Sequence, residues 1–366
     1  MECSTTDHQH QRLSRIFSSF AAIRQNESPL YCRLSRIVAA DSELMSPLDV
    51  VPTDPQLPTR YFAAIHYLLL GGADHAIRSV YLDPGSGLPN DRVLASRLRS
   101  FVAEHRGEIS HLVATRRTQT NEVNRVAVIV PALRVAAQLA GTPLALIDVG
   151  TSAGLNLRFD HFRCCYSSGH RLGDPLSLVR LGCELRGELV PPLGPAPEVP
   201  ARIGIDIAPV DVDDEDQVRW LCACVFPDQP ERITRLRGAI EVARANPIPV
   251  VTGDAIETLP EILAGISGEL TPVIMHTWVL AYLSPKARAD FAAQLVELAR
   301  QRPLLWIGAE WPENIPGRRR QDADQETVWF LASLHSGDAR WFTLASSHDH
   351  GTWLQWRSKE PGCATG

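Results

Sequence analysis

The sequence lacks the cysteine and histidine spacings of a disulfide or metal framework. Its eight cysteines are scattered, with no C-x-x-C pair and no Cys/His cluster at zinc spacing. We therefore predict reduced thiols and no resident metal. The run His348-Asp349-His350-Gly351 is instead typical of a hairpin turn, in which Gly351 takes a positive φ.

The sequence also has few long runs of apolar residues or of residues with the same charge. The formal net charge is -6, and the one compact basic run, Arg318-Arg319-Arg320, is followed by acids, so a nucleic-acid partner is not predicted. No apolar run approaches the roughly 20 residues that a membrane span needs, and the start, with Asp7, His8 and His10, lacks a signal-peptide core. We predict a cytoplasmic protein that acts on a small molecule without a membrane partner. Its oligomeric state stays open.

The 366 residues are 45% apolar, which is enough to fill an ordinary core. Helical apolar spacing comes first, in Arg60–Leu70, Asp91–His105 and Val123–Ala140. Short apolar runs typical of strands follow, at Leu144–Val149, Arg202–Ile207, Pro249–Thr252, Pro272–Met275, Pro303–Gly308, Trp341–Ser346 and Thr352–Trp356.

This order predicts an α/β fold with a Rossmann-like, mostly parallel sheet of about seven strands that ends in an antiparallel hairpin. We expect a helical N-terminal region at 1–141, a Rossmann-like domain at 142–358 and a tail at 359–366. A Gly- and Pro-rich insertion of short strands and loops is expected at about 161–201.

The turn after the strand Leu144–Val149 is the strongest candidate for a ligand site, because Gly-rich turns at strand ends bring backbone close to ligands. The dinucleotide pattern G-x-G-x-x-G fails at Ser152 and Leu155. The nucleophile elbow G-x-S-x-G is matched by Gly150, Ser152 and Gly154. The first motif of class I S-adenosylmethionine-dependent methyltransferases, an acid followed by G-x-G-x-G, is matched from Asp148 except that Ser152 replaces the middle glycine.

The order of elements separates the last two patterns. A hydrolase nucleophile follows several strands, whereas almost no strand-like run precedes Leu144. The methyltransferase order is therefore favoured. Two alternatives stay open: a serine hydrolase in which Ser152 is the nucleophile and His348 or His350 the base, and a non-catalytic protein that binds a nucleoside ligand in the same turn.

The chain resembles a class I methyltransferase-like fold over roughly residues 120–358, and more narrowly it resembles domain-of-unknown-function family 2332. The residues that carry this resemblance are Thr120-Asn121-Glu122-Val123 with Arg125, Gly150-x-Ser152-Ala153-Gly154-Leu155-Asn156, Gly173-Asp174-Pro175, Gly204-Ile205-Asp206 and His350-Gly351. The resemblance implies the fold. It supplies no substrate and no established reaction.

We predict that S-adenosylmethionine binds along Asp148–Asn156, with contacts from Asp148, Gly150, Ser152, Gly154 and Asn156. Asp206 ends a strand where this fold places the acid that holds ribose hydroxyls. Asp174 is the fallback for that role. Asp254 ends the next strand and is predicted to lie near the adenine.

Two further groups complete the predicted site. Asn121 and Arg125 stand at the start of the helix that leads into the central strand, and a guanidinium suits a ligand carboxylate. His276 and Glu310 stand at or just beyond later strand ends, where this fold faces the reacting methyl group. They are the candidate catalytic residues.

Overall fold

The computed structural model describes residues 5–49, 51–83, 87–316 and 326–359. The Arg318-Arg319-Arg320 run and all but the first residue of the predicted tail lie outside the described residues. The chain divides into two compact units, Met1–Thr120 with Asp213–Arg237, and Asn121–Val212 with Gly238–Gly366. Each unit therefore contains two separate segments of chain.

The first unit is helical. Its helices are α1 (Thr5–Ile23), α2 (Pro29–Ala39), α3 (Ser42–Met45), η1 (Ser46–Leu48), α4 (Leu57–Leu70), α5 (Arg78–Leu82), α6 (Asp91–Glu104), α7 (Arg106–Thr115), α9 (Glu215–Ala223) and the start of α10 (Pro230–Ala245). The predicted helix starts are confirmed at α6, where Asn90 Oδ1 accepts the N–H of Val93 at 3.0 Å. Helix α4 begins three residues earlier than predicted, at Leu57.

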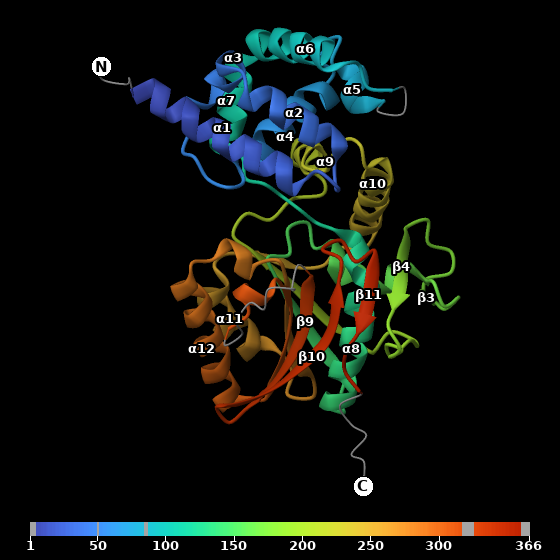
Figure 1. The fold of residues 1–366 in the computed structure, drawn as a ribbon. Coiled ribbons are helices and arrows are strands. Elements are labelled where there is room, and N and C mark those ends of the chain that lie inside the picture. Colours follow the sequence, from blue (N-terminus) through green and yellow to red (C-terminus); the bar gives the residue numbers. More distant parts are fainter. Residues whose placement is uncertain (1–4, 50, 84–86, 317–325, 360–366) are drawn as a thin grey trace. The chain divides into compact units, whose positions relative to one another are not determined.

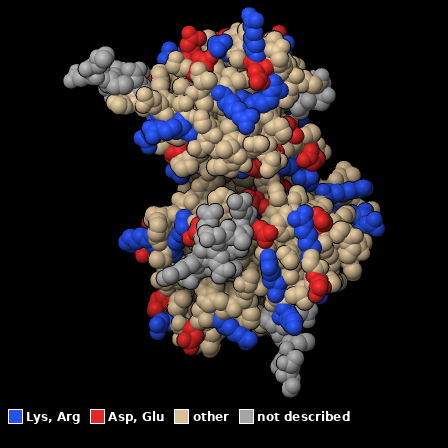
Figure 2. Space-filling model, viewed as in Figure 1, with Lys and Arg blue, Asp and Glu red and all other residues tan. Residues whose placement is uncertain are grey.

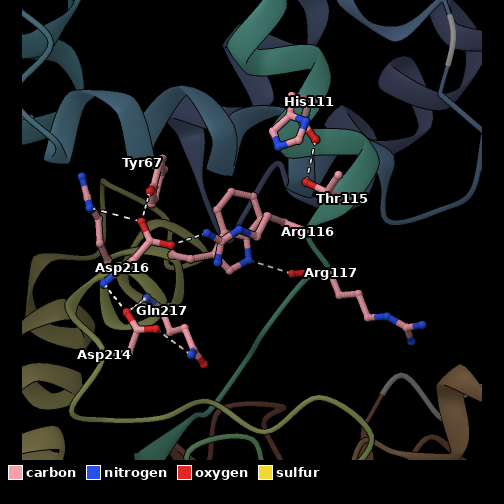
Figure 3. Close-up of polar contacts among 10 residues, drawn as sticks. Tyr67, His111, Thr115, Arg116, Arg117, Asp214, Asp216 and Gln217 are labelled. Atoms are coloured by element: carbon pink, nitrogen blue, oxygen red, sulfur yellow. Dashed lines mark hydrogen bonds and ion pairs between the residues drawn. The ribbon is translucent and has the colours of Figure 1, made fainter.

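Side-chain contacts hold the second segment of this unit against the first, as Figure 3 shows. The carboxylate of Asp216 on α9 accepts hydrogen bonds from the Tyr67 hydroxyl and the Arg116 guanidinium. The indole N–H of Trp220 donates to the carbonyl of Arg117 at 2.8 Å. The hydrogen bond from Tyr67 is the main cause that lowers the pKa of Asp216. These contacts explain why 213–237 belongs to the helical unit.

The second unit contains an eleven-stranded mixed sheet (Figure 1). Its strands are β1 (Leu144–Val149), β2 (Arg163–Tyr166), β3 (Arg171–Gly173), β4 (Arg180–Arg186), β5 (Ala201–Asp206), β6 (Val250–Thr252), β7 (Thr271–Thr277), β8 (Leu304–Glu310), β9 (Thr327–His335), β10 (Asp338–Ser347) and β11 (Trp353–Trp356). They lie in the order β3-β2-β4-β11-β10-β9-β8-β7-β1-β5-β6.

The predicted fold class is confirmed, but the predicted count of about seven strands is wrong. Strands β6, β5, β1, β7 and β8 are parallel, and β9, β10 and β11 continue the sheet with antiparallel pairs. The predicted final hairpin is the β10–β11 pair. The four additional strands are β9, which was not predicted, and β2, β3 and β4, which lie in the predicted insertion and extend the same sheet through β4 and β11.

Helices cover both faces of this sheet. Helices α11 (Ala255–Gly265) and α12 (Pro285–Gln301) lie together on one side, and α8 (Val126–Ala140) lies on the other (Figure 1). The core under α11 and α12 includes Trp306 and Phe330 from the sheet. Short 3₁₀ helices occupy the connections: η3 (Val123–Arg125), η4 (Leu155–His161), η5 (Leu280–Tyr282) and η6 (Pro312–Asn314).

Helix α8 belongs to the sheet unit, whereas the predicted boundary after residue 141 assigns it to the helical region. It packs against β2, β4 and η4, so the division falls before it, at Thr120. The segment Val123–Ala140 is the one stretch among the described residues that is long and apolar enough to cross a membrane, which corrects the expectation that none approaches that length. Because 72% of it is buried inside the protein, it has the character of a core helix.

Candidate cofactor site

The parallel part of the sheet has a topological switch point beside β1. Strand β1 pairs with β5 on one side and with β7 on the other. After the insertion with β2, β3 and β4, the chain adds β5 and β6 on one side of β1, and then returns across the sheet to add β7 and β8 on the other side. In open α/β sheets, ligands bind at such a point, beyond the carboxyl ends of the strands. The turn that follows β1 lies at this position.

The turn Gly150–Gly154 has left-handed backbone at alternate residues, with φ of 69° at Gly150, 54° at Ser152 and 66° at Gly154. A Cβ on Gly150 would lie 2.4 Å from Cγ2 of Val279, so this position excludes a side chain. Ser152 adopts a left-handed backbone conformation, which costs a non-glycine residue about 1–2 kcal/mol. The turn is thus tightly specified by its neighbours.

Asp148 supports the turn from below. Its side chain is only 3% exposed, and its Oδ2 accepts the hydroxyl of Thr151 at 2.8 Å. Burial raises the pKa of Asp148 to about 7; the hydrogen bond from Thr151 and the charge of Arg125 oppose that rise, whereas Asp206 adds to it. Thr151 was not predicted as a site residue, although it stands inside the turn motif.

Asp206 connects the end of β5 to the turn. Its Oδ2 accepts the N–H of Ser152 and its Oδ1 the N–H of Ala208, both at 2.8 Å. The residue is half-buried. Asp174, the fallback for the ribose, lies in the β3–β4 loop and accepts the N–H of Leu176. The geometry therefore favours Asp206.

Asn121 bridges the two ends of the turn. Its Nδ2 donates to the carbonyl of Thr151, and its Oδ1 accepts the N–H of Leu155, both at 3.2 Å. Asn156, the second residue of η4, is 3% exposed, and its Oδ1 has no hydrogen-bond partner among the described residues. An unpaired buried acceptor is costly unless a ligand or water satisfies it.

Arg125 reaches the carboxyl end of β7. The side chain is 6% exposed, its Nε donates to the carbonyl of Asp349 at 2.8 Å, and its Nη1 donates to Oγ1 of Thr277 at 3.2 Å. Asp349 belongs to the turn before Gly351, whose φ of 65° confirms the predicted hairpin turn. Arg125 thus holds a fixed guanidinium beside the switch point.

His276 and Glu310 form a fully buried pair. Both side chains are 0% exposed, and His276 Nδ1 lies 3.0 Å from Glu310 Oε1. The Glu310 carboxylate also accepts three successive N–H groups, those of Val279 and Leu280 at 2.8 Å and that of Ala281 at 3.3 Å. The geometry favours a positioning role for this pair, which fixes the loop after β7. Their catalytic role stays a prediction.

Asp254 caps helix α11. Its Oδ1 accepts the N–H of Ile256 at 2.7 Å, and the side chain is exposed. The capping bond satisfies one carboxylate oxygen and leaves the exposed face accessible. Contact with an adenine ring stays a prediction.

The loop after β7 contains a residue that the sequence analysis missed. Trp278 has a φ of 61°, which is unusual for a bulky side chain. The centroid of its ring lies 5.9 Å from Cζ of Arg125, which stands over the ring, and 4.8 Å from the centroid of the Trp311 ring. Nothing in a local sequence pattern signals a left-handed tryptophan, because neighbouring strands impose that conformation.

The surroundings of Ser152 differ from those of the nucleophile in an α/β-hydrolase. Ser152 is 3% exposed, and β1 is the first strand within the described part of the chain, so no strand comes before the turn. An elbow in an α/β-hydrolase presents an exposed serine between a strand and an α-helix, whereas η4 here is a 3₁₀ helix with non-helical backbone at Arg158.

Charge and metal-binding groups are dispersed. Within the ranges that the structure describes, no three His, Cys, Asp or Glu side chains gather to hold a metal ion. On the face drawn in Figure 2, basic and acidic side chains are interspersed. The predicted absence of a nucleic-acid partner stays a prediction.

The fold and the turn define a Rossmann-like α/β protein with a candidate ligand site at the switch point of a parallel sheet. The chain belongs to the family described as "Uncharacterized protein conserved in bacteria (DUF2332)", which matches residues 14–356. This confirms the family that the sequence motifs indicated.

Other comparisons are distant. A medium-resolution structure of the bifunctional kinase-methyltransferase WbdD is 13% identical, with 54% of this chain and 31% of that chain covered and a TM-score of 0.24. A WbdD structure at 2.2 Å is 10% identical, with 59% and 49% covered and a TM-score of 0.25. The chain therefore spans less than half of the length of WbdD. No curated protein matches this chain.

Proposed function

We propose that this protein binds S-adenosylmethionine at the turn Gly150–Gly154 and transfers its methyl group to a small-molecule acceptor. The observation that carries the proposal is the contact between Asp206 and the backbone of Ser152, at the ends of adjacent strands. A carboxylate in this position is suited to hold ribose hydroxyls beside the turn.

The same turn argues against a dinucleotide. A pyrophosphate needs close backbone approach at glycines and the N-terminus of an α-helix. Here Ser152 stands at a glycine position, and the turn leads into the irregular 3₁₀ helix η4. A nucleoside ligand without a pyrophosphate fits this arrangement better.

The residues around the turn match the polar groups of S-adenosylmethionine. Asn156 offers an unpaired buried acceptor for an ammonium or amino group, and Arg125 offers a guanidinium for the carboxylate. When bound, the sulfonium group supplies an electrophilic methyl carbon. The protein then mainly has to orient the acceptor, and orientation of this kind can supply about 7–11 kcal/mol of the barrier.

Replacing Gly154 with tryptophan is expected to abolish binding of S-adenosylmethionine and of its demethylated product in isothermal titration calorimetry. A Cβ at this position already lies 3.1 Å from Nη1 of Arg158, so an indole would fill the turn. Gly141→Trp is the matched control, because Gly141 has a φ of 67° but open space around its Cβ. Undiminished binding in Gly154→Trp would place the cofactor elsewhere.

Replacing Arg125 with alanine is expected to weaken binding of the demethylated product about 10- to 100-fold, because a charge-assisted hydrogen bond contributes roughly 1.5–3 kcal/mol. Arg134→Ala, on the same α8 region but bonded to the carbonyl of Pro195, should bind as wild type does. Thermal unfolding of both variants checks that each is folded. Equal affinities for Arg125→Ala and wild type would remove Arg125 from the site.

A serine-directed fluorophosphonate probe is expected to leave the wild-type protein unlabelled, because Ser152 is 3% exposed. Labelling that disappears in Ser152→Ala would support the hydrolase alternative instead.

An assay with a labelled methyl donor distinguishes the non-catalytic alternative from methyl transfer. Binding of the donor without transfer to any acceptor in metabolite or protein extracts would support the non-catalytic alternative.

A further inference from the structure

Two tryptophans follow the ends of neighbouring parallel strands. His276 and Thr277 of β7 pair with Gly308 and Ala309 of β8, so the next residues of the two strands emerge side by side. The rings of Trp278 and Trp311 meet edge to face, with centroids 4.8 Å apart and planes at 74°. They form a corner with two aromatic surfaces, which we call the tryptophan corner.

The protein holds Trp278 in this corner against its backbone preference. Its φ is 61°, its N–H donates to the carbonyl of Ala309 at 2.9 Å, and Glu310 binds the three amides that follow. Conformations that cost energy persist where the surroundings impose them, and they cluster at ligand sites. The hydrogen bonds from these amides to Glu310 therefore fix the backbone that orients the Trp278 indole.

The corner also contains an unused hydrogen-bond donor. Nε1 of Trp278 is buried and has no hydrogen-bond partner among the described residues. Trp311 is 38% exposed, so the adjoining aromatic surface is accessible. A planar ligand that carries an oxygen or nitrogen acceptor satisfies both features, because rings pack favourably on aromatic rings and the acceptor takes the indole N–H.

Charge narrows the ligand class. Cζ of Arg125 lies 5.9 Å from the centroid of the Trp278 ring, and the Arg125 side chain is 6% exposed. This buried positive charge occupies the cation–π position on Trp278 and repels a second cation. A quaternary ammonium ligand is therefore disfavoured, whereas a neutral or anionic aromatic ring is favoured.

We infer that the tryptophan corner binds the methyl acceptor, and that the acceptor is a neutral or anionic planar aromatic compound with a hydrogen-bond acceptor atom. This inference rests on the proposed function, since Arg125, which lies against Trp278, is also one of the residues proposed to bind the donor. It assigns Trp278 and Trp311 to acceptor specificity, and the His276–Glu310 pair to the positioning of Trp278.

The test is saturation-transfer NMR on the full chain with the demethylated donor present. The probes are 4-hydroxybenzoate, its non-planar analogue 4-hydroxycyclohexanecarboxylate, and choline. We expect 4-hydroxybenzoate to bind in preference to the other two. In Trp311→Leu its affinity should fall roughly two- to tenfold, the loss of one aromatic contact. Trp341→Leu is the matched control, because Trp341 is 43% exposed and also packs on aromatic rings, but on β10.

Choline binding, equal affinity for the non-planar analogue, or an unchanged affinity in Trp311→Leu would each overturn the inference. Absence of 4-hydroxybenzoate binding while the demethylated donor binds overturns the inference and leaves the proposed function standing. If the protein binds 4-hydroxybenzoate but does not bind the demethylated donor, the tryptophan corner is an aromatic subsite and the proposed function is wrong.

Discussion

Replacing Glu310 with alanine is expected to lower the free energy of unfolding by about 3–5 kcal/mol, measured by urea denaturation. The carboxylate accepts three successive backbone N–H groups and contacts His276, and all of these partners lose their acceptor in the variant. A buried donor left without a partner costs about 1–3 kcal/mol, so the loss of the acceptor shared by three backbone N–H groups accounts for an effect of this size.

Glu313→Ala is the control for this substitution. Glu313 is an exposed glutamate on the neighbouring helix η6, and a surface change of this kind usually alters stability by about 0.5 kcal/mol or less. If Glu310→Ala unfolds at the wild-type urea concentration but loses methyl transfer, Glu310 acts in the chemistry and the positioning role is wrong.

Replacing Asp148 with asparagine is expected to stabilise the protein at neutral pH but not at pH 4. Burial raises the pKa of Asp148 in the folded state from 3.8 to about 7. Between these values the folded protein holds a proton that the unfolded chain releases, so wild-type stability decreases as pH rises through this window. The gap corresponds to roughly 4 kcal/mol, and asparagine does not titrate. The stability difference between variant and wild type should therefore grow from pH 4 to pH 7.

Asp160→Asn should show the opposite trend. Burial alone would raise the pKa of Asp160, but hydrogen bonds from Arg202 outweigh that effect and lower it. Because the pKa of Asp160 is lower in the folded protein than in the unfolded chain, its carboxylate stabilises the folded protein at pH values above the unfolded pKa. This stabilisation is lost as the pH falls through the folded pKa. Asp160→Asn should therefore be least stable, relative to wild type, at neutral pH. Parallel pH trends for the two variants would contradict the assignment of Asp148 as a buried carboxyl.

The parallel half of the sheet could be predicted because each strand there is a short apolar run that ends at a turn or an acid. The ends of strands β5 to β8 fall within two residues of the predicted runs. Strand β9 was missed, because it follows a charged segment and is defined by pairing with β8 and β10. The attachment of β4 to β11 was missed for the same reason: pairing between distant segments has no local signal.

The positions of the candidate site residues along the fold could be predicted from the sequence, whereas the directions of their side chains were harder to predict. The turn and Asp206 could be placed at the switch point because strand ends can be read from the sequence, and Arg125 could be placed near it because it starts the helix that leads into β1. The direction of the His276 side chain could not be predicted, since successive side chains along a strand alternate between the two faces of the sheet and the face of each one is not evident from the sequence. His276 points into the core, whereas Thr277, the next residue, reaches Arg125.

The pairing of β4 with β11 has a consequence for how the chain is made. Trp353 aligns with Glu184, so the edge of β4 emerges from the ribosome long before the strand that covers it. Contacts of such long sequence separation form late and slow folding. Until then β4 presents unpaired N–H and C=O groups that can pair with another chain. Biosynthesis of this sheet therefore depends on its last strand, and a chain halted before Trp353 would be prone to aggregation.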